Sequence, residues 1–246
     1  MQSFKTQLML LPGLDGTGTL FRPLQDVLDR DMHCEIVAYP SDQELDLAQL
    51  AAIVLRRLSE IDTANAVILA ESFSGLVALA LLSQSQTNIA GIVFVGAFAQ
   101  PPHPLLTRLG GLVRFSAPFV RSIPSFLIRQ YCLGADASAA HLRLLRQALG
   151  KVSPGVLAQR MRLVATHHSF GERFDAPCCY IRATEDRLVP ASSTQWFQQR
   201  FNKLRMEEVR GPHFLLQAKP RESAMAIERA VRWMTARESG EKILRT

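Results

Sequence analysis

The stretch AVILAESFSGLVALALL, residues 66–82, decides the fold of this chain. Its first five residues are an uninterrupted apolar run, which is typical of a strand buried on both faces of a sheet. The apolar residues that follow the serines favour a helix over 73–84. Ser72 is therefore expected on a tight turn between a strand and a helix, and the small side chains of Ala70 and Ser74 suit such a turn.

The same alternation of strand and helix extends over most of the 246 residues. Short apolar runs predict strands at 8–11, 34–39, 66–70, 92–98, 178–183 and 205–209. Amphipathic stretches between the runs predict helices at 19–29, 46–60, 73–84, 191–201 and 219–237. This pattern indicates an α/β protein with a mostly parallel six-stranded sheet and helices on both faces.

The alternation stops between residues 101 and 175, which open with three prolines and contain helical patches but no convincing strand. We therefore divide the chain into a core, residues 1–100 and 176–246, and an inserted helical lid, residues 101–175. The lid holds ten lysines and arginines against three acidic side chains, whereas the whole chain carries a formal charge of only +6. All of the excess positive charge therefore belongs to the lid.

Composition narrows the class of protein. An apolar fraction of 48% and a charged fraction of 20% are typical of globular proteins. The longest apolar run, residues 89–99, is shorter than the ~18 residues of a membrane span, so no span is expected. Neither a signal peptide nor a disulfide pattern is recognisable, and we expect a cytoplasmic protein. We expect no metal, because His167, His168, Cys178 and Cys179 match no zinc spacing, and no nucleic acid, because no binding module is recognisable.

A serine on the expected turn becomes an effective nucleophile when a base takes its proton and a carboxylate orients that base. Asp186 directly follows the strand expected at 178–183, and His213 follows the last expected strand. Because Ser72 also follows a strand, all three side chains are expected at the carboxyl edge of the sheet. The sequence therefore predicts Ser72 as nucleophile, His213 as base and Asp186 as the orienting acid.

Each of these assignments has an alternative. Glu185 is the other candidate acid, and Asp186 is alternatively a turn or cap residue. Ser74 is the competing serine, although it would point into the first turn of the helix. The serines are alternatively helix caps in a polar loop. Five further histidines compete with His213, although none follows an expected strand at the right place: His33, His103, His141, His167 and His168.

Attack on an acyl carbonyl builds negative charge on oxygen, which backbone donors must already face. One expected donor is the amide of Phe73, directly after Ser72. The other comes from the glycine-rich loop GLDGTG, residues 13–18, whose backbone can turn sharply. We expect the amide of Leu14 to be this second donor. A phosphate-binding turn is the alternative interpretation of this loop, but neither a dinucleotide motif nor a P-loop has this spacing.

Four segments together resemble the alpha/beta hydrolase superfamily over nearly the whole chain: PGLDGTG (12–18), AESFSG (70–75), ATEDRLVP (183–190) and GPHFLLQAKP (211–220). They are similar to the esterase, lipase and thioesterase group, and the place of the lid resembles that of pimeloyl-acyl carrier protein methyl ester esterases. The resemblance implies an alpha/beta-hydrolase fold with strand order 2-1-3-4-5-6 and an active site in the chain order serine, aspartate, histidine. One departure is Pro12-Gly13, where the family usually has His-Gly. The family's initial hairpin is not expected, since only seven residues precede the strand expected at 8–11.

These motifs predict a serine hydrolase that cleaves a small-molecule carboxylic ester or thioester through an acyl-enzyme, with no cofactor. Acyl transfer and a lyase reaction are alternatives on the same three residues, and a non-catalytic binding protein of the same fold is another. Aromatic residues of the lid are expected to form a substrate-binding wall: Phe115, Phe119, Phe126 and Tyr131. The alternative is that they only pack the lid onto the core.

The arginines of the lid predict an acidic partner. Eight arginines occur between residues 108 and 162, a range with one acidic side chain, Asp136. Such a concentration of charge attracts an anionic molecule over a long range. An acyl carrier protein fits both the charge and the resemblance, and a solvated surface without a partner is the alternative. The arginines chosen for this contact are Arg121, Arg129, Arg143 and Arg146.

Overall fold

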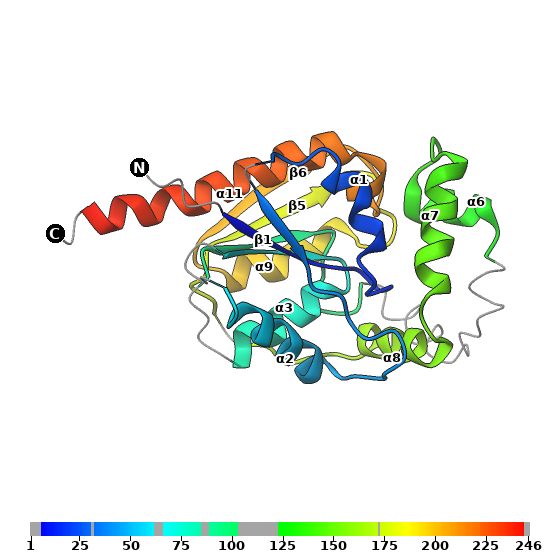
Figure 1. Ribbon diagram of the computed structural model, residues 1–246, viewed down its shortest axis with the longest axis horizontal. Coiled ribbons are helices and arrows are strands. Elements are labelled where there is room, and N and C mark those ends of the chain that lie inside the picture. Colours follow the sequence, from blue (N-terminus) through cyan, green and yellow to red (C-terminus); the bar gives the residue numbers. More distant parts are fainter. Residues whose placement is uncertain are drawn as a thin grey trace.

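The computed structural model describes residues 6–30, 32–61, 66–84, 89–102, 123–171 and 173–243, with side chains to residue 236. A six-stranded sheet forms its centre (Figure 1). The strands are β1 (Gln7–Leu11), β2 (His33–Ile36), β3 (Ala66–Glu71), β4 (Gly91–Val95), β5 (Cys178–Ala183) and β6 (Leu204–Val209). Their order is β2-β1-β3-β4-β5-β6, and all neighbours are parallel. The α/β class and the strand order expected from the sequence are confirmed.

Helices cover both faces of the sheet, as Figure 1 shows. One face packs against α2 (Leu47–Leu58), α3 (Ser74–Gln84) and α9 (Thr194–Arg200). The other face packs against α1 (Arg22–Gln25), α10 (Leu215–Ala218) and α11 (Pro220–Ile243). Two short 3-10 turns, η1 (Thr19–Phe21) and η4 (Ala191–Ser193), precede α1 and α9.

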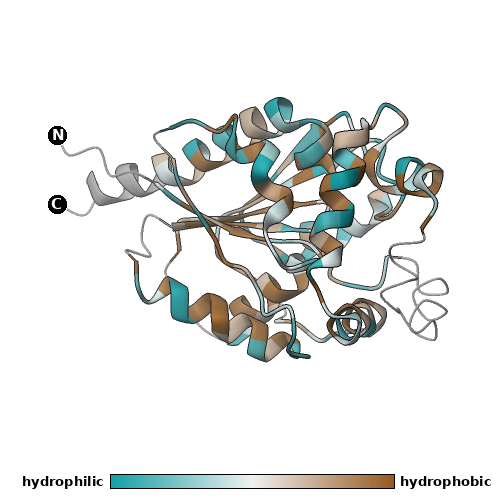
Figure 2. Ribbon diagram, turned by 45° about the vertical axis from the view of Figure 1, so that its right-hand side comes forward, coloured by the Kyte–Doolittle hydropathy of each residue, from teal (hydrophilic) through white to brown (hydrophobic). Residues whose placement is uncertain are grey.

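The core follows from the alternation of side chains along each strand. β3 and β4 are buried at every position. Because successive side chains point to opposite faces, Ile68 and Phe94 pack under α2, α3 and α9, whereas Val67 and Val93 pack under α1 and α11. Figure 2 shows the strands in brown across the middle of the molecule, with helices of mixed hydropathy on either side. The sheet is therefore enclosed by two apolar layers.

Between β4 and β5 the chain leaves the sheet and forms what we call the inserted segment, residues 123–171 as far as it is described. It contains α6 (Ser125–Ile128), a π-helical turn η3 (Arg129–Leu133), α7 (Ala139–Gly150) and α8 (Pro154–Ala165). Ser138 and His141 form a capping box that starts α7, and Ser153 caps α8. No strand occurs among its described residues, in agreement with the sequence. That residues 101–175 act as a lid stays a prediction.

The inserted segment lies beyond the carboxyl ends of the strands, where α6 and α7 form the right-hand side of Figure 1. A backbone hydrogen bond from Ser153 N to Ser41 O, 2.8 Å, ties it to the loop after β2. None of the helices in the described part of the chain combines the length and apolar character that crossing a bilayer requires.

We expect Phe94→Ala to lower the free energy of unfolding by about 3–5 kcal/mol, because it removes a buried ring and leaves a cavity. The centroid of the Phe94 ring lies 4.8 Å from that of Phe197 and 5.8 Å from that of Phe201. Phe126→Ala is the control: its side chain is 66% exposed, so its loss should cost less than about 0.5 kcal/mol. Urea denaturation followed by circular dichroism measures both. Equal losses from the two variants would contradict this account of the core.

Candidate active site

Ser72 lies on the sharp turn between β3 and α3. Its φ of 50° makes it the one non-glycine residue with positive φ in the described part of the chain. A residue with a β-carbon adopts this conformation only where its surroundings hold it. Here Ser72 N donates to Val95 O and Gly75 N donates to Ser72 O, both at 2.9 Å. Gly75 is required as well, because an added β-carbon would lie 2.7 Å from Cβ of Ala97.

The structure brings Ser72, His213 and Asp186 together at the carboxyl edge of the sheet. Ser72 Oγ lies 2.9 Å from His213 Nε2, and His213 Nδ1 lies 2.7 Å from Asp186 Oδ2. The side chains of His213 and Asp186 are 6% and 5% exposed. The other oxygen of Asp186 accepts hydrogen bonds from two backbone amides, at 2.8 Å each. Asp186 is thus fixed so that the imidazole carries its proton on Nδ1 and presents Nε2 to the serine.

The competing acid and serine take other positions. Glu185 is exposed and pairs with Arg210 at 2.8 Å. Ser74 is buried, where it donates to Pro12 O and shares a hydrogen bond of 2.7 Å with the Tyr39 hydroxyl. Ser74 therefore holds the loop after β1, a role that its sequence position alone did not indicate.

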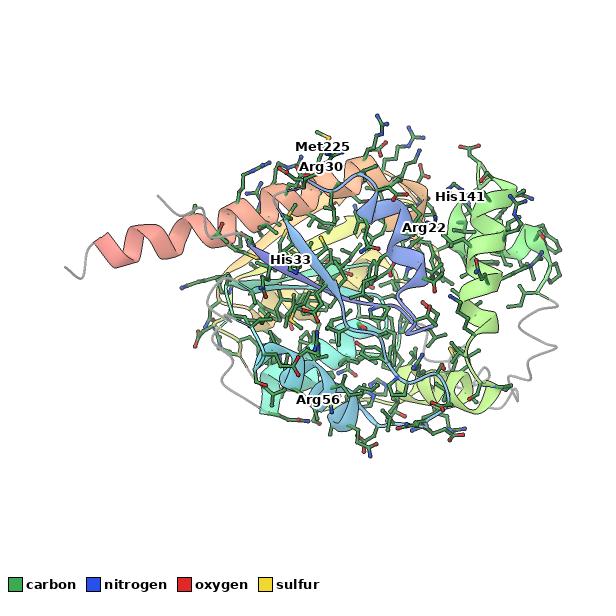
Figure 3. The ribbon with its side chains drawn as sticks, viewed as in Figure 1. Arg22, Arg30, His33, Arg56, His141 and Met225 are labelled. Atoms are coloured by element: carbon green, nitrogen blue, oxygen red, sulfur yellow. The ribbon has the colours of Figure 1, made fainter. Side chains whose placement is uncertain are left out.

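The competing histidines lie elsewhere. His33 is exposed on β2 at the edge of the sheet, and His141 belongs to the cap of α7; Figure 3 labels both. His167 contacts the side chain of Gln100, and His168 contacts a backbone carbonyl of α8. His103 lies outside the described residues. Cys178 and Cys179 are buried in β5, and nowhere in the described chain do three potential metal ligands gather.

The two expected oxyanion donors line the same cavity as Ser72 and His213. Phe73 follows Ser72 and directly precedes α3. Leu14 lies on the loop after β1, where Gly16 has a φ of 68° and donates from its amide to Gly13 O at 3.0 Å. Because a left-handed conformation favours glycine, Gly16 allows this turn. The role of the two amides stays a prediction.

A cavity of about 490 Å³ lies above Ser72. Its wall is mostly apolar and is shared by the core and the inserted segment. The core contributes Phe73, Phe98, Leu188, Val189 and Phe214. The inserted segment contributes Leu127, Ile128, Tyr131, Leu145 and Leu149. Such a wall suits an apolar group held next to Ser72.

The aromatic residues expected in the substrate-binding wall lie in different places. Tyr131 lines the cavity. Phe126 is not among the described residues that line the cavity, and its side chain is 66% exposed. The reason is that α6 is a single turn that directs Ile128 inward and so leaves Phe126 outside. Phe115 and Phe119 lie outside the described residues.

The arginines expected to bind a partner also differ from one another. Arg143 is exposed on α7. Arg146 is exposed too, lines the cavity and donates to Ser125 Oγ at 2.9 Å. Arg129 is half-buried and donates to a backbone carbonyl of its own segment at 3.1 Å. Arg121 lies outside the described residues.

Sequence reasoning missed Glu71, which directly precedes Ser72 and lines the cavity. Its side chain is buried, and Oε1 accepts a hydrogen bond from Gln217 Nε2 at 2.9 Å. Burial raises the pKa of Glu71 to about 7, and the nearby carboxylate of Asp15 adds to the shift. The sequence does carry one sign of it, because Glu71 is a charged residue at the end of an otherwise apolar run.

Sequence comparison identifies the family of the chain. Residues 8–226 match the sequence model of the alpha/beta hydrolase family. The chain belongs to this family. No curated protein matched the sequence.

Several solved structures share the alpha/beta hydrolase fold of this chain. An enol-lactonase from Burkholderia xenovorans LB400 has a TM-score of 0.75 at 13% identity, over 92% of this chain and 90% of that one. A thermophilic esterase from Thermogutta terrifontis has a TM-score of 0.72 at 16% identity, over 93% and 90%. YbtT, a type II thioesterase from the yersiniabactin NRPS/PKS pathway, has a TM-score of 0.68 at 18% identity, over 95% and 96%.

We expect Glu71→Gln to change how stability depends on pH. The unfolded chain releases the Glu71 proton near its ordinary pKa of 4.5, whereas the folded protein keeps it to about pH 7. The folded state therefore binds more protons between these values, and the free energy of unfolding falls as pH rises through this window. Between pH 4.5 and 7, the free energy of unfolding of Glu71→Gln should therefore rise by about 3 kcal/mol relative to that of wild type.

Urea denaturation at several pH values measures this difference. Glu185→Gln is the control, because the exposed Glu185 carboxylate stays in contact with water when the chain folds. A stability difference between wild type and Glu71→Gln that does not vary with pH would contradict the prediction.

Proposed function

We propose that this protein is a serine hydrolase that cleaves a carboxylic ester or thioester through an acyl-enzyme. One observation carries the proposal. Ser72 Oγ, His213 and Asp186 form a continuous series of contacts of 2.9 Å and 2.7 Å. A serine held on a strained turn beside such an imidazole is what acyl transfer requires. Family membership and the esterase and thioesterase among the similar structures support the class.

The proposed reaction has two halves. Ser72 Oγ attacks the acyl carbonyl while His213 Nε2 takes its proton, and Asp186 stabilises the imidazolium. The amides of Leu14 and Phe73 bind the oxyanion. His213 then gives the proton to the departing alcohol or thiol, which leaves the acyl group on Ser72. A water molecule, deprotonated by His213, attacks this acyl-enzyme, and His213 returns that proton to Ser72 Oγ as the carboxylic acid leaves.

The cavity supports an acyl group as the bound part of the substrate. Its apolar wall meets the nucleophile directly, so an alkyl or aryl acyl chain would leave water on binding. Tyr131 and Leu127 place the inserted segment in this wall. We therefore propose that the inserted segment sets the preferred chain length.

The exposed arginines support an acyl carrier protein as the donor of that acyl group. Arg143 and Arg146 are exposed on α7, and Arg146 also lines the cavity. An acidic carrier docked on α7 would hold its acyl chain beside the cavity, and complementary charge speeds such encounters.

We also propose a cytoplasmic location. All four cysteines are free thiols: Cys34, Cys132, Cys178 and Cys179. Free thiols are usual where the compartment is reducing, which supports the cytoplasm over a secretory compartment.

We expect Ser72→Ala and His213→Ala to fold and to lose nearly all turnover, by about a millionfold as in proteases with such residues. Asp186→Asn should lower turnover on the order of ten-thousandfold or less, since the imidazole then takes the wrong tautomer. Glu185→Gln is the matched control and should keep its activity. Hydrolysis of p-nitrophenyl esters and acyl thioesters of graded chain length measures these effects. Turnover of Ser72→Ala within tenfold of wild type would refute the assignment.

Labelling with a fluorophosphonate, together with the ester panel, distinguishes a hydrolase from an acyltransferase or lyase and from a binding protein. A hydrolase is labelled at Ser72 and releases acid from the ester panel. An acyltransferase or lyase that uses the same serine is labelled but releases little acid. A binding protein without turnover stays unlabelled, and that result would refute the proposed function.

We expect Arg143→Glu to lower kcat/KM for an acyl carrier-linked substrate on the order of tenfold more than for a small neutral ester. The difference should shrink with added salt, because exposed charges are screened over about 10 Å at 0.1 M. Arg56→Glu is the control, since Arg56 is exposed on α2, well away from α7 (Figure 3). Equal losses with both substrates, or no loss with either, would show that α7 does not dock a carrier.

A further inference from the structure

Among the arginines of the arginine-rich range that the structure describes, Arg160 alone is buried. It lies on α8 and is only 2% exposed. Its Nη1 donates to Leu14 O at 3.0 Å and to Asp15 O at 2.7 Å, and its Nη2 donates to Pro40 O at 3.0 Å. Its Cζ lies 5.7 Å from the centre of the Tyr39 ring. A buried guanidinium is costly unless it is well hydrogen-bonded, so these contacts account for its place.

The carbonyls that Arg160 binds belong to the loop that carries the expected oxyanion donor. Leu14 and Asp15 are successive residues of this loop, and both line the cavity. Gly16, the next residue, packs directly on the guanidinium: an added β-carbon there would lie 2.7 Å from Arg160 Cζ. Arg160 therefore holds three successive loop residues in one position.

The loop is held from two sides. On the core side, Ser74 Oγ at the start of α3 donates to Pro12 O, and Tyr39 supports Ser74. On the other side is Arg160, which comes from the inserted segment. The same segment also contacts the loop of the catalytic histidine, because Phe214 N donates to Cys132 O at 3.0 Å. The inserted segment is thus joined to two of the loops that form the site.

Arg160 is not among the described residues that line the cavity, and we therefore expect it to act on the loop and not on the substrate. An oxyanion donor lowers the barrier only if its N–H already points to where the negative charge develops. A small shift of the loop would therefore slow the reaction while leaving apolar binding of the acyl group intact.

We propose that Arg160 is a positioning residue for the Leu14 amide, through which the inserted segment sets the rate of acyl transfer. This inference rests on the proposed function and deepens it. The excess positive charge of the segment then has two uses: the buried Arg160 orders the loop, whereas exposed arginines such as Arg143 are free to meet a partner.

Arg160→Met and Arg160→Lys test the proposal, with Arg162→Met as the matched control. Arg162 lies on the same helix, and it reaches the loop after β2 through an exposed pair with Glu44 at 3.2 Å. Lysine keeps the charge, but all its N–H groups belong to a single nitrogen, so it cannot cover the separate positions that Nη1 and Nη2 of the guanidinium fork reach. It should therefore fall between methionine and wild type.

Three quantities are measured on folded protein: kcat and KM for a p-nitrophenyl ester, and the inhibition constant of an alkyl trifluoromethyl ketone. Ser72 Oγ adds to the ketone carbon and its proton passes to His213, which leaves an oxyanion where the tetrahedral intermediate has one. We expect Arg160→Met to lose on the order of a hundredfold in kcat and a similar factor in ketone affinity. KM should stay within about threefold, and Arg162→Met should match wild type.

The outcomes are separable. Folded Arg160 variants that keep kcat within twofold of Arg162→Met would overturn the proposal, as would a loss confined to KM with unchanged ketone affinity. If Arg160→Met does not fold, Arg160→Lys decides by the same criteria. If neither folds, Arg160 serves the fold as a whole and the proposal is overturned. A wild-type protein that neither hydrolyses esters nor reacts with a fluorophosphonate would refute the proposed function, and this inference with it.

Discussion

The left-handed backbone at Ser72 is the constraint on which the rest of the site depends. A φ of 50° is unfavourable for a residue with a β-carbon, and two things maintain it here: the hydrogen bond to Val95 and the close approach of Gly75 to Ala97. This turn presents Oγ at the edge of the sheet, where it meets His213. Since all six strands are parallel, the loops that carry Asp186 and His213 begin at the same edge. The strained turn at Ser72 and the parallel strands together bring the three side chains to one place.

Buried polar groups surround this apolar cavity and hold its loops. Glu71 is tied by Gln217, whose Nε2 also donates to a backbone carbonyl near α1 at 3.2 Å. Asp15 accepts a hydrogen bond from the Thr17 amide at 2.9 Å, and its burial raises its pKa. Each such group costs stability when it is taken out of water. The cost is concentrated beside Ser72, where loop geometry matters most for chemistry.

In the function proposed above, the inserted segment contributes to both substrate choice and rate. Its helices α6, α7 and α8 and the turn η3 all contribute apolar side chains to the wall of the cavity, and α8 also reaches the loop after β1 through Arg160. Charge alone does not separate these uses. Arg143 and Arg160 are equal in a count of charges, yet one is exposed and the other is buried against backbone carbonyls.

Local patterns in the sequence predicted the strands and placed Ser72, Asp186 and His213 directly after three of them, whereas the strand order came from the resemblance to alpha/beta hydrolases. Apolar runs mark buried strands, small residues around Ser72 mark the turn, and Asp186 and His213 follow their strands directly. Tertiary structure alone decided which side chains support them. Arg160 binds carbonyls 146, 145 and 120 positions away, and Ser74 binds one 62 positions away. No local pattern records such contacts, because they exist only once distant segments have packed together.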